Sequence, residues 1–169
     1  MAADRRYWDS NAFLGFLNNE KEKAAACESV LNAAEEGKID IVTSALTMTE
    51  VIKKKGEKPI PKESERKIRD FFEHSWIIVR EVDRFVAEHA RDLIWAHGLS
   101  SPDAIHLATA LGLKLSVMDT FDGDLIKLSG KLGNPRLVIG HPNIPHTPDF
   151  FPAEKHEAAK AHGKSKKKK

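Results

Sequence analysis

The chain of 169 residues contains very little cysteine and no long apolar run, and each shortage excludes a class of protein. Its one cysteine, Cys27, can form neither an internal disulfide nor a zinc cluster alone, so we expect a reducing, cytoplasmic setting. No stretch approaches the ~20 uncharged apolar residues that a membrane-spanning helix needs, so we expect no membrane insertion. The basic pair Arg5-Arg6 is followed by no apolar stretch, so we expect no secretory signal peptide.

Several phosphate-binding and ion-binding motifs are also absent. The sequence has no GxxxxGKS or GxxxxGKT segment, and no GxGxxG follows a candidate strand, so neither a P-loop nor a dinucleotide-binding fold is supported. An EF-hand loop starting at Asp119 fails because Phe121 occupies its third position and Gly130 its twelfth, where a glutamate is needed. A phosphoaspartate receiver would need two acids after the first strand, where Asp9 stands alone, so it is kept only as a distant alternative.

The sequence does contain enough apolar residues for a hydrophobic core, since it is 41% hydrophobic and 31% charged. Its net charge of +2 is unevenly distributed: residues 155–169 hold seven lysines and one glutamate, and the rest of the chain is mildly acidic. Repeated prolines exclude regular structure after residue 141. We therefore expect one folded domain over 5–140, a proline-rich extension over 141–154 and a disordered lysine-rich tail over 155–169.

Short β-rich stretches alternate with longer segments whose apolar residues have helical spacing. The Ser101-Pro102 pair predicts the N-cap and the first position of one of these helices. The predicted strands are 5–8, 39–44, 76–82, 114–118 and 136–140, and the predicted helices are 21–36, 63–74, 83–97 and 102–111. This alternation is typical of a parallel sheet with helices on both faces.

Acidic residues follow the predicted strands at matching positions. Asp9 follows the first strand, Glu50 lies about one helical turn after the second, and Asp103 opens the helix before the fourth. Three aspartates, at 119, 122 and 124, follow the fourth strand. Because ligands bind beyond the carboxyl ends of parallel strands, we expect these acids to converge at one edge of the sheet. Clustered carboxylates repel one another, and Mg²⁺ or Mn²⁺ would supply the counter-charge and suit phosphodiester hydrolysis.

Each acid also has a purely structural interpretation. Asp9 could cap the helix that follows it, and Glu50 could complete a capping box with Thr47. Asp103 could be a first-turn acid favoured by the helix dipole, and Asp122 could begin a turn. No single motif decides between the two interpretations. The recurrence of acids at matching strand ends is what favours a metal site.

Four stretches, in this order, resemble the PIN domain, the nuclease fold of VapC-type toxins of toxin–antitoxin pairs. They are YWDSNAFLGFL (7–17), SALTMTEVIKK (44–54), LSSPDAIHLATALGLKLSV (99–117) and TFDGDLIKL (120–128). The resemblance covers residues 6–138, and PDAIHLATA followed by a strand and TFDGDL is its most specific part. It implies a three-layer α/β/α sandwich with a mostly parallel central sheet of four to five strands.

The resemblance also implies roles for individual residues. It places the family's catalytic acids on Asp9, Glu50, Asp103 and Asp122. The implied ligands for Mg²⁺ or Mn²⁺ are Asp9, Asp103, Asp122 and Asp124. Asp119 is kept open as a further ligand, because it departs from the family pattern, in which an apolar residue commonly precedes the threonine. The expected auxiliary residues are Ser10, Asn11 and Thr120.

The predicted function is a metal-dependent endoribonuclease that hydrolyses RNA phosphodiester bonds as the toxin of a toxin–antitoxin pair. The partners implied are RNA, an antitoxin protein and a second copy of the chain in a homodimer. An RNA-processing nuclease without an antitoxin, and a catalytically degenerate module that only binds RNA or another partner, stay open as alternatives.

Two groups of lysines are predicted to contact the RNA backbone. They are Lys53, Lys54 and Lys55 after the second strand, and Lys166 and Lys167 in the tail. His106 lies three residues after Asp103 on the same helical face. We interpret it as a packed or hydrogen-bonded histidine rather than as a donor to a ligand.

Overall fold

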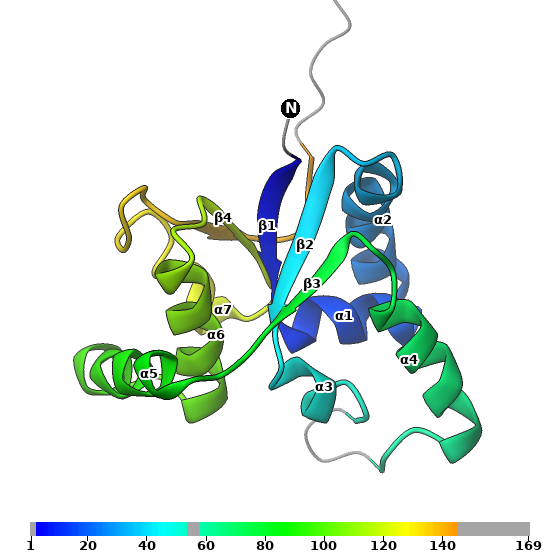
Figure 1. Ribbon diagram of the computed structural model, residues 1–169, viewed down its shortest axis with the longest axis horizontal. Helices are drawn as coiled ribbons and strands as arrows, with labels where there is room; N and C mark the ends of the chain where they lie inside the picture. Colours follow the sequence, from blue (N-terminus) through cyan, green and yellow to red (C-terminus); the bar gives the residue numbers. More distant parts are fainter. Residues whose placement is uncertain (1–2, 54–57, 145–169) are drawn as a thin grey trace, which may run out of the picture.

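The computed structural model describes residues 3–53 and 58–144, which form a five-stranded, wholly parallel sheet with helices on both faces (Figure 1). The strands are β1 (Asp4–Trp8), β2 (Ile39–Ser44), β3 (Ile77–Arg80), β4 (Val117–Asp119) and β5 (Val138–Gly140). The helices are α1 (Ser10–Leu17), α2 (Lys21–Glu35), α3 (Thr47–Glu50), η1 (Lys62–Ser64), α4 (Glu65–Phe72), α5 (Arg84–His97), α6 (Ser101–Gly112) and α7 (Gly123–Ile126). The predicted three-layer α/β/α sandwich is confirmed.

Two hydrophobic cores lie on opposite faces of the sheet, because successive residues of a strand point to opposite sides. Tyr7 belongs to the core shared with α5 and α6, and its neighbour Trp8 belongs to the core shared with α1, α2 and α4. Both side chains are fully buried. Figure 1 shows the same division, with α5 and α6 on one side of the strands and α1, α2 and α4 on the other. Cys27 is buried in the second core.

Most predicted elements lie within a few residues of their expected bounds, and two differences have local causes. Helix α6 is capped by Ser100 rather than Ser101, because the Ser100 hydroxyl accepts the Asp103 amide hydrogen, with an N···O distance of 3.3 Å. Strand β4 begins at Val117 instead of Lys114. Lys114 has a left-handed backbone, with φ of 54°, and therefore belongs to the turn after α6.

The strand order β3-β2-β1-β4-β5 changes direction at the centre of the sheet. Strand β1 pairs with β2 on one side and with β4 on the other, in a register that places Trp8 beside Asp119. After β1 the chain enters α1 in one core, and after β4 it enters α7, whose Leu125 belongs to the other core. Open parallel sheets bind ligands at such a switch point, beyond the carboxyl ends of the strands.

Some predictions fall outside the described residues. These are most of the proline-rich extension, the lysine-rich tail with Lys166 and Lys167, and Lys54 and Lys55. The domain bounds of 5 and 140 stay predictions. Within 3–53 and 58–144, no helix is both long enough and apolar enough to cross a membrane.

Candidate active site

Asp9 stands at the carboxyl end of β1 and also caps α1. Its Oδ1 accepts the Ala12 amide hydrogen at 3.0 Å, and its Oδ2 accepts the Thr120 hydroxyl at 2.5 Å. The residue is only 1% exposed. Burial raises the pKa of Asp9 to about 6, although the charge of His106 and both hydrogen bonds act to lower it. Asp9 is therefore rigidly held, and its negative charge is only partly compensated.

Thr120 follows β4 directly and connects Asp9 to the TFDGDL stretch. Its hydroxyl donates to Asp9 and accepts the Asp122 amide hydrogen at 2.9 Å. Asp122 is the N-cap of α7, because its Oδ1 accepts the amide hydrogens of Asp124 and Leu125 at 2.8 and 3.1 Å. The structural and chemical interpretations of Asp122 are therefore compatible: one oxygen caps the helix while the residue lines the cleft described below.

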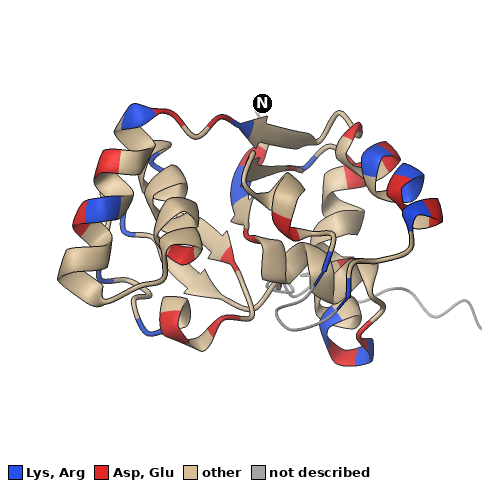
Figure 2. Ribbon diagram, turned by 90° about the horizontal axis from the view of Figure 1, so that it is seen from below, with Lys and Arg blue, Asp and Glu red and all other residues tan. Residues whose placement is uncertain are grey.

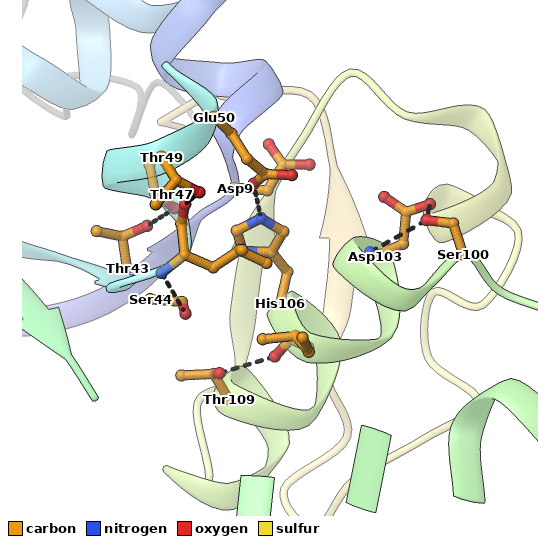
Figure 3. Close-up of polar contacts among 12 residues, drawn as sticks. Asp9, Thr43, Ser44, Thr47, Thr49, Glu50, Ser100, Asp103, His106 and Thr109 are labelled. Atoms are coloured by element: carbon orange, nitrogen blue, oxygen red, sulfur yellow. Dashed lines mark hydrogen bonds and ion pairs between the residues drawn. The ribbon is translucent and has the colours of Figure 1, made fainter. Parts of the chain in front are cut away.

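Glu50 ends α3, and its side chain turns toward α6. Its Oε2 lies 2.8 Å from Nε2 of His106, whose Nδ1 lies 2.8 Å from the Tyr7 hydroxyl oxygen. Figure 3 shows the Glu50 carboxylate pointing toward the His106 ring. Burial raises the pKa of Glu50, but the hydrogen bond and charge of His106 outweigh that effect and lower it overall.

The capping-box interpretation of Glu50 is wrong. Leu46 is the N-cap of α3, and it makes no side-chain capping bond. Thr47 lies inside the helix, and its hydroxyl forms a 2.7 Å hydrogen bond with the Thr43 hydroxyl instead (Figure 3). Glu50 instead contacts His106, which is therefore a buried, hydrogen-bonded residue whose partner is one of the candidate catalytic acids.

Asp103 lies in the first turn of α6. Its Oδ2 accepts the Ser100 hydroxyl at 2.5 Å (Figure 3). Burial raises the pKa of Asp103, the Ser100 bond lowers it, and the charges of Asp122 and Glu50 raise it further. The charge of Asp103 in turn raises the pKa of Asp9. These mutual effects show that the structure brings acids from four separate segments into one electrostatic environment.

An open cleft of about 1340 Å³ lies at this edge of the sheet, bordered by α1, α3, α6 and α7. Glu50, Asp103 and Asp122 line it, as do the predicted auxiliary residues Ser10 and Asn11. In Figure 2, acidic segments of the ribbon from both halves of the molecule lie around the centre of the view. In the described part of the chain, no three His, Cys, Asp or Glu residues form a group that could hold a metal ion. The donors are nevertheless carboxylate oxygens, which hard divalent cations prefer.

A sequence model of the PIN domain matches residues 6–131 of the chain. The chain belongs to the PIN domain family. Two solved structures share the fold. One is a toxin–antitoxin complex from Klebsiella pneumoniae (21% identity, TM-score 0.51, covering 69% of this chain and 86% of that chain). The other is VapC20 from Mycobacterium tuberculosis, described as a sarcin–ricin loop cleaving toxin (17% identity, TM-score 0.54, covering 70% of this chain and 91% of that chain). Among curated proteins there is no match.

Two of the candidate ligands of this PIN domain have cationic partners. Arg6 donates to both oxygens of Asp119, at 2.9 and 2.6 Å, and the Trp8 indole donates to Oδ2 at 2.9 Å. Asp119 and Asp9 are both 1% exposed and absent from the described residues that line the cleft, so the contacts with Arg6 and Trp8 are what distinguish Asp119. Asp124 lines the cleft but forms a 2.7 Å ion pair with Lys127. These contacts favour Asp122 as the fourth acid, and the role of each acid stays a prediction.

Three residues that support or border the site of the PIN domain were not predicted. Arg6 and Tyr7 lie on β1, just before Asp9. Side chains two residues apart on a strand share a face, and this spacing could have indicated that Tyr7 lies near Asp9. Lys23 lines the cleft from α2; its ammonium forms a 2.8 Å ion pair with Glu20 and lies 5.4 Å from the Phe121 ring centroid. Nothing in the sequence pattern indicates Lys23, because its position depends on how α2 packs.

The raised pKa of Asp9 predicts a pH-dependent loss of stability in the metal-free PIN domain. An unfolded aspartate ionises near pH ~3.9, whereas folded Asp9 keeps its proton up to about pH 6. The folded state therefore binds more protons between these values, and the unfolding free energy falls as pH rises through them. The expected contribution is on the order of 2–3 kcal/mol.

Asp9→Asn lacks this titration, and the asparagine can still cap α1. Urea unfolding at about pH 4 and about pH 7 should show the variant gaining stability relative to the unsubstituted protein as pH rises. A stability difference that stays constant with pH would contradict the prediction.

Proposed function

We propose that this PIN domain is a metal-dependent endoribonuclease whose catalytic acids are Asp9, Glu50, Asp103 and Asp122. The observation that carries the proposal is their convergence at the switch point of the sheet, beside one open cleft. Burial and mutual repulsion raise the pKa of both Asp9 and Asp103. Such a group of acids needs an added positive charge before all its members can be ionised at neutral pH.

The carboxylate oxygens of these residues are the donors that Mg²⁺ and Mn²⁺ prefer, which supports such an ion as that charge. We assign Asp9, Asp103 and Asp122 as ligands, with Asp124 as a further ligand if it separates from Lys127. Each carboxylate oxygen has two lone pairs, so the hydrogen bonds that Asp9 accepts leave it able to bind a cation. A bound ion would activate water and neutralise charge on the phosphate. The chain itself supplies the geometry, because Thr120 fixes Asp9 and the cap of α7 fixes Asp122.

The cleft favours an extended nucleic acid strand as the substrate. Three lysines line it: Lys53, Lys23, which is paired with Glu20, and Lys127, which is paired with Asp124. Lysines at the rim would bind backbone phosphates, while the acids hold the metal at the phosphate to be cleaved. RNA is favoured over DNA because VapC20, which has the same fold, is described as cleaving the sarcin–ricin loop.

We infer that the biological role is that of a toxin, active in the cytoplasm as a homodimer and restrained by an antitoxin protein. The shared fold of the Klebsiella toxin–antitoxin complex and of VapC20 supports this role. Co-expression tests it: the chain alone should arrest growth of a bacterial host, and co-expression of the neighbouring gene should restore growth. Unimpaired growth despite soluble, active protein would favour an RNA-processing nuclease instead.

The activity itself is tested with labelled single-stranded and hairpin RNAs. Cleavage should require Mn²⁺ or Mg²⁺ and should stop when EDTA is added. RNA that binds but yields no metal-dependent product would identify a catalytically degenerate binding module.

Lys23→Ala should weaken RNA binding through the loss of one phosphate contact. Lys23 lines the cleft, and its ammonium lies 5.4 Å from the centroid of the Phe121 ring and 2.8 Å from Glu20. For single-stranded RNA, the slope of log K against log salt concentration should fall in magnitude by about 0.7. Fluorescence anisotropy with a non-cleaving Asp103→Asn background measures the slope.

Lys21→Ala is the matched control for Lys23→Ala. Lys21 lies on the same helix, is exposed, and does not belong to the described lining of the cleft. Its substitution should leave the slope nearly unchanged. Equal slopes for the two variants would show that Lys23 does not contact the RNA backbone.

A further inference from the structure

The position of Glu50 depends on contacts outside its own helix. Helix α3 has only four residues, and a single helical turn is not stable by itself because nucleation is unfavourable. External contacts fix its start. The Thr43 hydroxyl forms a 2.7 Å hydrogen bond with the Thr47 hydroxyl (Figure 3). It also donates to the Trp8 carbonyl oxygen at 2.7 Å. Glu50 lies at the other end of the helix, half-buried, where its carboxylate needs a separate anchor.

His106 is that anchor. Its ring is buried in α6, 1% exposed, and each ring nitrogen has one partner: Nε2 contacts Glu50 and Nδ1 contacts Tyr7, both at 2.8 Å. The two contacts join β1, α3 and α6. Neither His106 nor Tyr7 belongs to the described residues that line the cleft. Substrate in the cleft would therefore meet Glu50 and not the histidine behind it.

The donor and acceptor roles follow from the chemistry of the partners. The pKa of Glu50 is lowered, so its carboxylate is ionised near neutral pH and can only accept, which means that Nε2 carries the hydrogen. Nδ1 faces the Tyr7 hydroxyl, which can donate a hydrogen to the ring nitrogen or accept one from it. The ring can satisfy both partners in only one orientation.

We propose that His106 is a positioning residue, held by Tyr7, that orients the Glu50 carboxylate toward the cleft. The role rests on the proposed nuclease function, in which Glu50 acts at the metal-bound phosphate. Hydrogen-bonding partners that orient the acidic residues of metal sites typically affect metal affinity or activity about 10–100-fold when they are lost. The sequence alone indicates a packed or hydrogen-bonded His106 but cannot identify its two partners, because they are distant along the chain.

Two substitutions of His106 separate orientation of Glu50 from simple packing. The side-chain nitrogen of glutamine is as many bonds from Cα as Nε2 of histidine, whereas that of asparagine matches Nδ1. His106→Gln can therefore keep the donor to Glu50, while His106→Asn keeps only the position that faces Tyr7. Tyr7→Phe removes the hydroxyl that holds the ring and retains the buried aromatic group.

The expected results distinguish kcat from RNA affinity. His106→Asn should lower kcat about 10–100-fold, and His106→Gln should stay within about tenfold of the unsubstituted enzyme. The dissociation constant for RNA, measured in EDTA, should be similar in all variants, because His106 does not line the cleft. Calorimetric titration with Mn²⁺ should show weaker binding to the asparagine variant than to the glutamine variant. Equal kcat and equal Mn²⁺ affinity in the two variants would overturn the proposal.

A spectroscopic test keeps the positioning role separate from the nuclease assignment and needs no activity. A buried Nε2–H that donates to Glu50 exchanges slowly with water, so the proton NMR spectrum of the metal-free protein should contain its downfield signal. Glu50→Ala should abolish that signal, and Tyr7→Phe should speed its exchange. If the signal persists in Glu50→Ala, His106 does not hold Glu50. If the signal behaves as expected but no RNA is cleaved with any metal, the proposed nuclease function is wrong, whereas the hydrogen bond from His106 to Glu50 is confirmed.

Discussion

Replacing Asp103 with asparagine is expected to abolish metal-dependent RNA cleavage and to leave the fold intact. Asp103 lines the cleft, and its charge is coupled to those of Asp9, Glu50 and Asp122. Losing a metal-bound carboxylate removes several kcal/mol of transition-state stabilisation, and about 3 kcal/mol corresponds to a fall of more than ~100-fold. Initial rates of RNA cleavage with Mn²⁺ measure the effect, and undiminished cleavage would remove Asp103 from the active site.

The same variant should not lose stability without metal. Burial and the charges of Asp122 and Glu50 raise the pKa of Asp103, so its ionised form opposes folding and a neutral asparagine relieves that repulsion. Thermal melting should therefore show an unchanged or higher Tm in EDTA, together with a smaller gain on adding Mn²⁺. Asp92→Asn is the matched control, because Asp92 is an exposed acid on α5; it should cleave RNA and respond to Mn²⁺ like the unsubstituted protein.

Arg6→Ala is expected to be the most destabilising of the substitutions considered. Arg6 is 12% exposed and makes two hydrogen bonds to Asp119, whose side chain is 1% exposed. Removing the guanidinium leaves a buried carboxylate without its counter-charge, which lowers the free energy of unfolding by about 3–5 kcal/mol. Arg5→Ala is the adjacent control: Arg5 is 61% exposed and its pair with Asp40 is 3.5 Å long, so the expected loss is about 1 kcal/mol or less.

The pH dependence of the Arg6→Ala effect identifies its cause. Burial raises the pKa of Asp119, and the hydrogen bonds and charge of Arg6 hold it down. Without Arg6 the folded-state pKa rises further, so the folded variant takes up a proton as pH falls while the unfolded chain does not. Urea unfolding should therefore show the gap to the unsubstituted protein narrowing at acidic pH. Equal losses at Arg5 and Arg6, or a gap independent of pH, would mean that the buried charge is not the cause.

The sequence could predict the sheet and the acidic edge because both depend on local patterns. Strand and helix periodicities identify the layers, and the carboxyl ends of parallel strands share one edge whatever the exact pairing. Asp9, Glu50 and Asp103 could therefore be singled out before their contacts were known. The family resemblance added Asp122 by aligning Thr120 and the aspartate after Phe121.

The contacts behind the acids could not be predicted, because they depend on register and packing between distant segments. Arg6 meets Asp119 only because β1 and β4 pair with Trp8 beside Asp119. Glu50 turns to His106 rather than capping α3, since α6 lies close enough to supply a donor. The sequence shows which residue types are present, but it does not show that these residues lie next to each other in the folded protein.

The central pairing of β1 with β4 has a consequence for when the site can exist. It joins positions 111 residues apart, and the Thr120 bond to Asp9 spans the same separation. Contacts of such long range form late, after most loop closure has been completed. A chain on the ribosome that has exposed Asp9, Glu50 and Asp103 still lacks the Thr120 hydroxyl that fixes Asp9 until the region around Thr120 and Asp122 has emerged. If the proposed nuclease function holds, the enzyme would stay inactive during synthesis until the segment that contains Thr120 and Asp122 has left the ribosome.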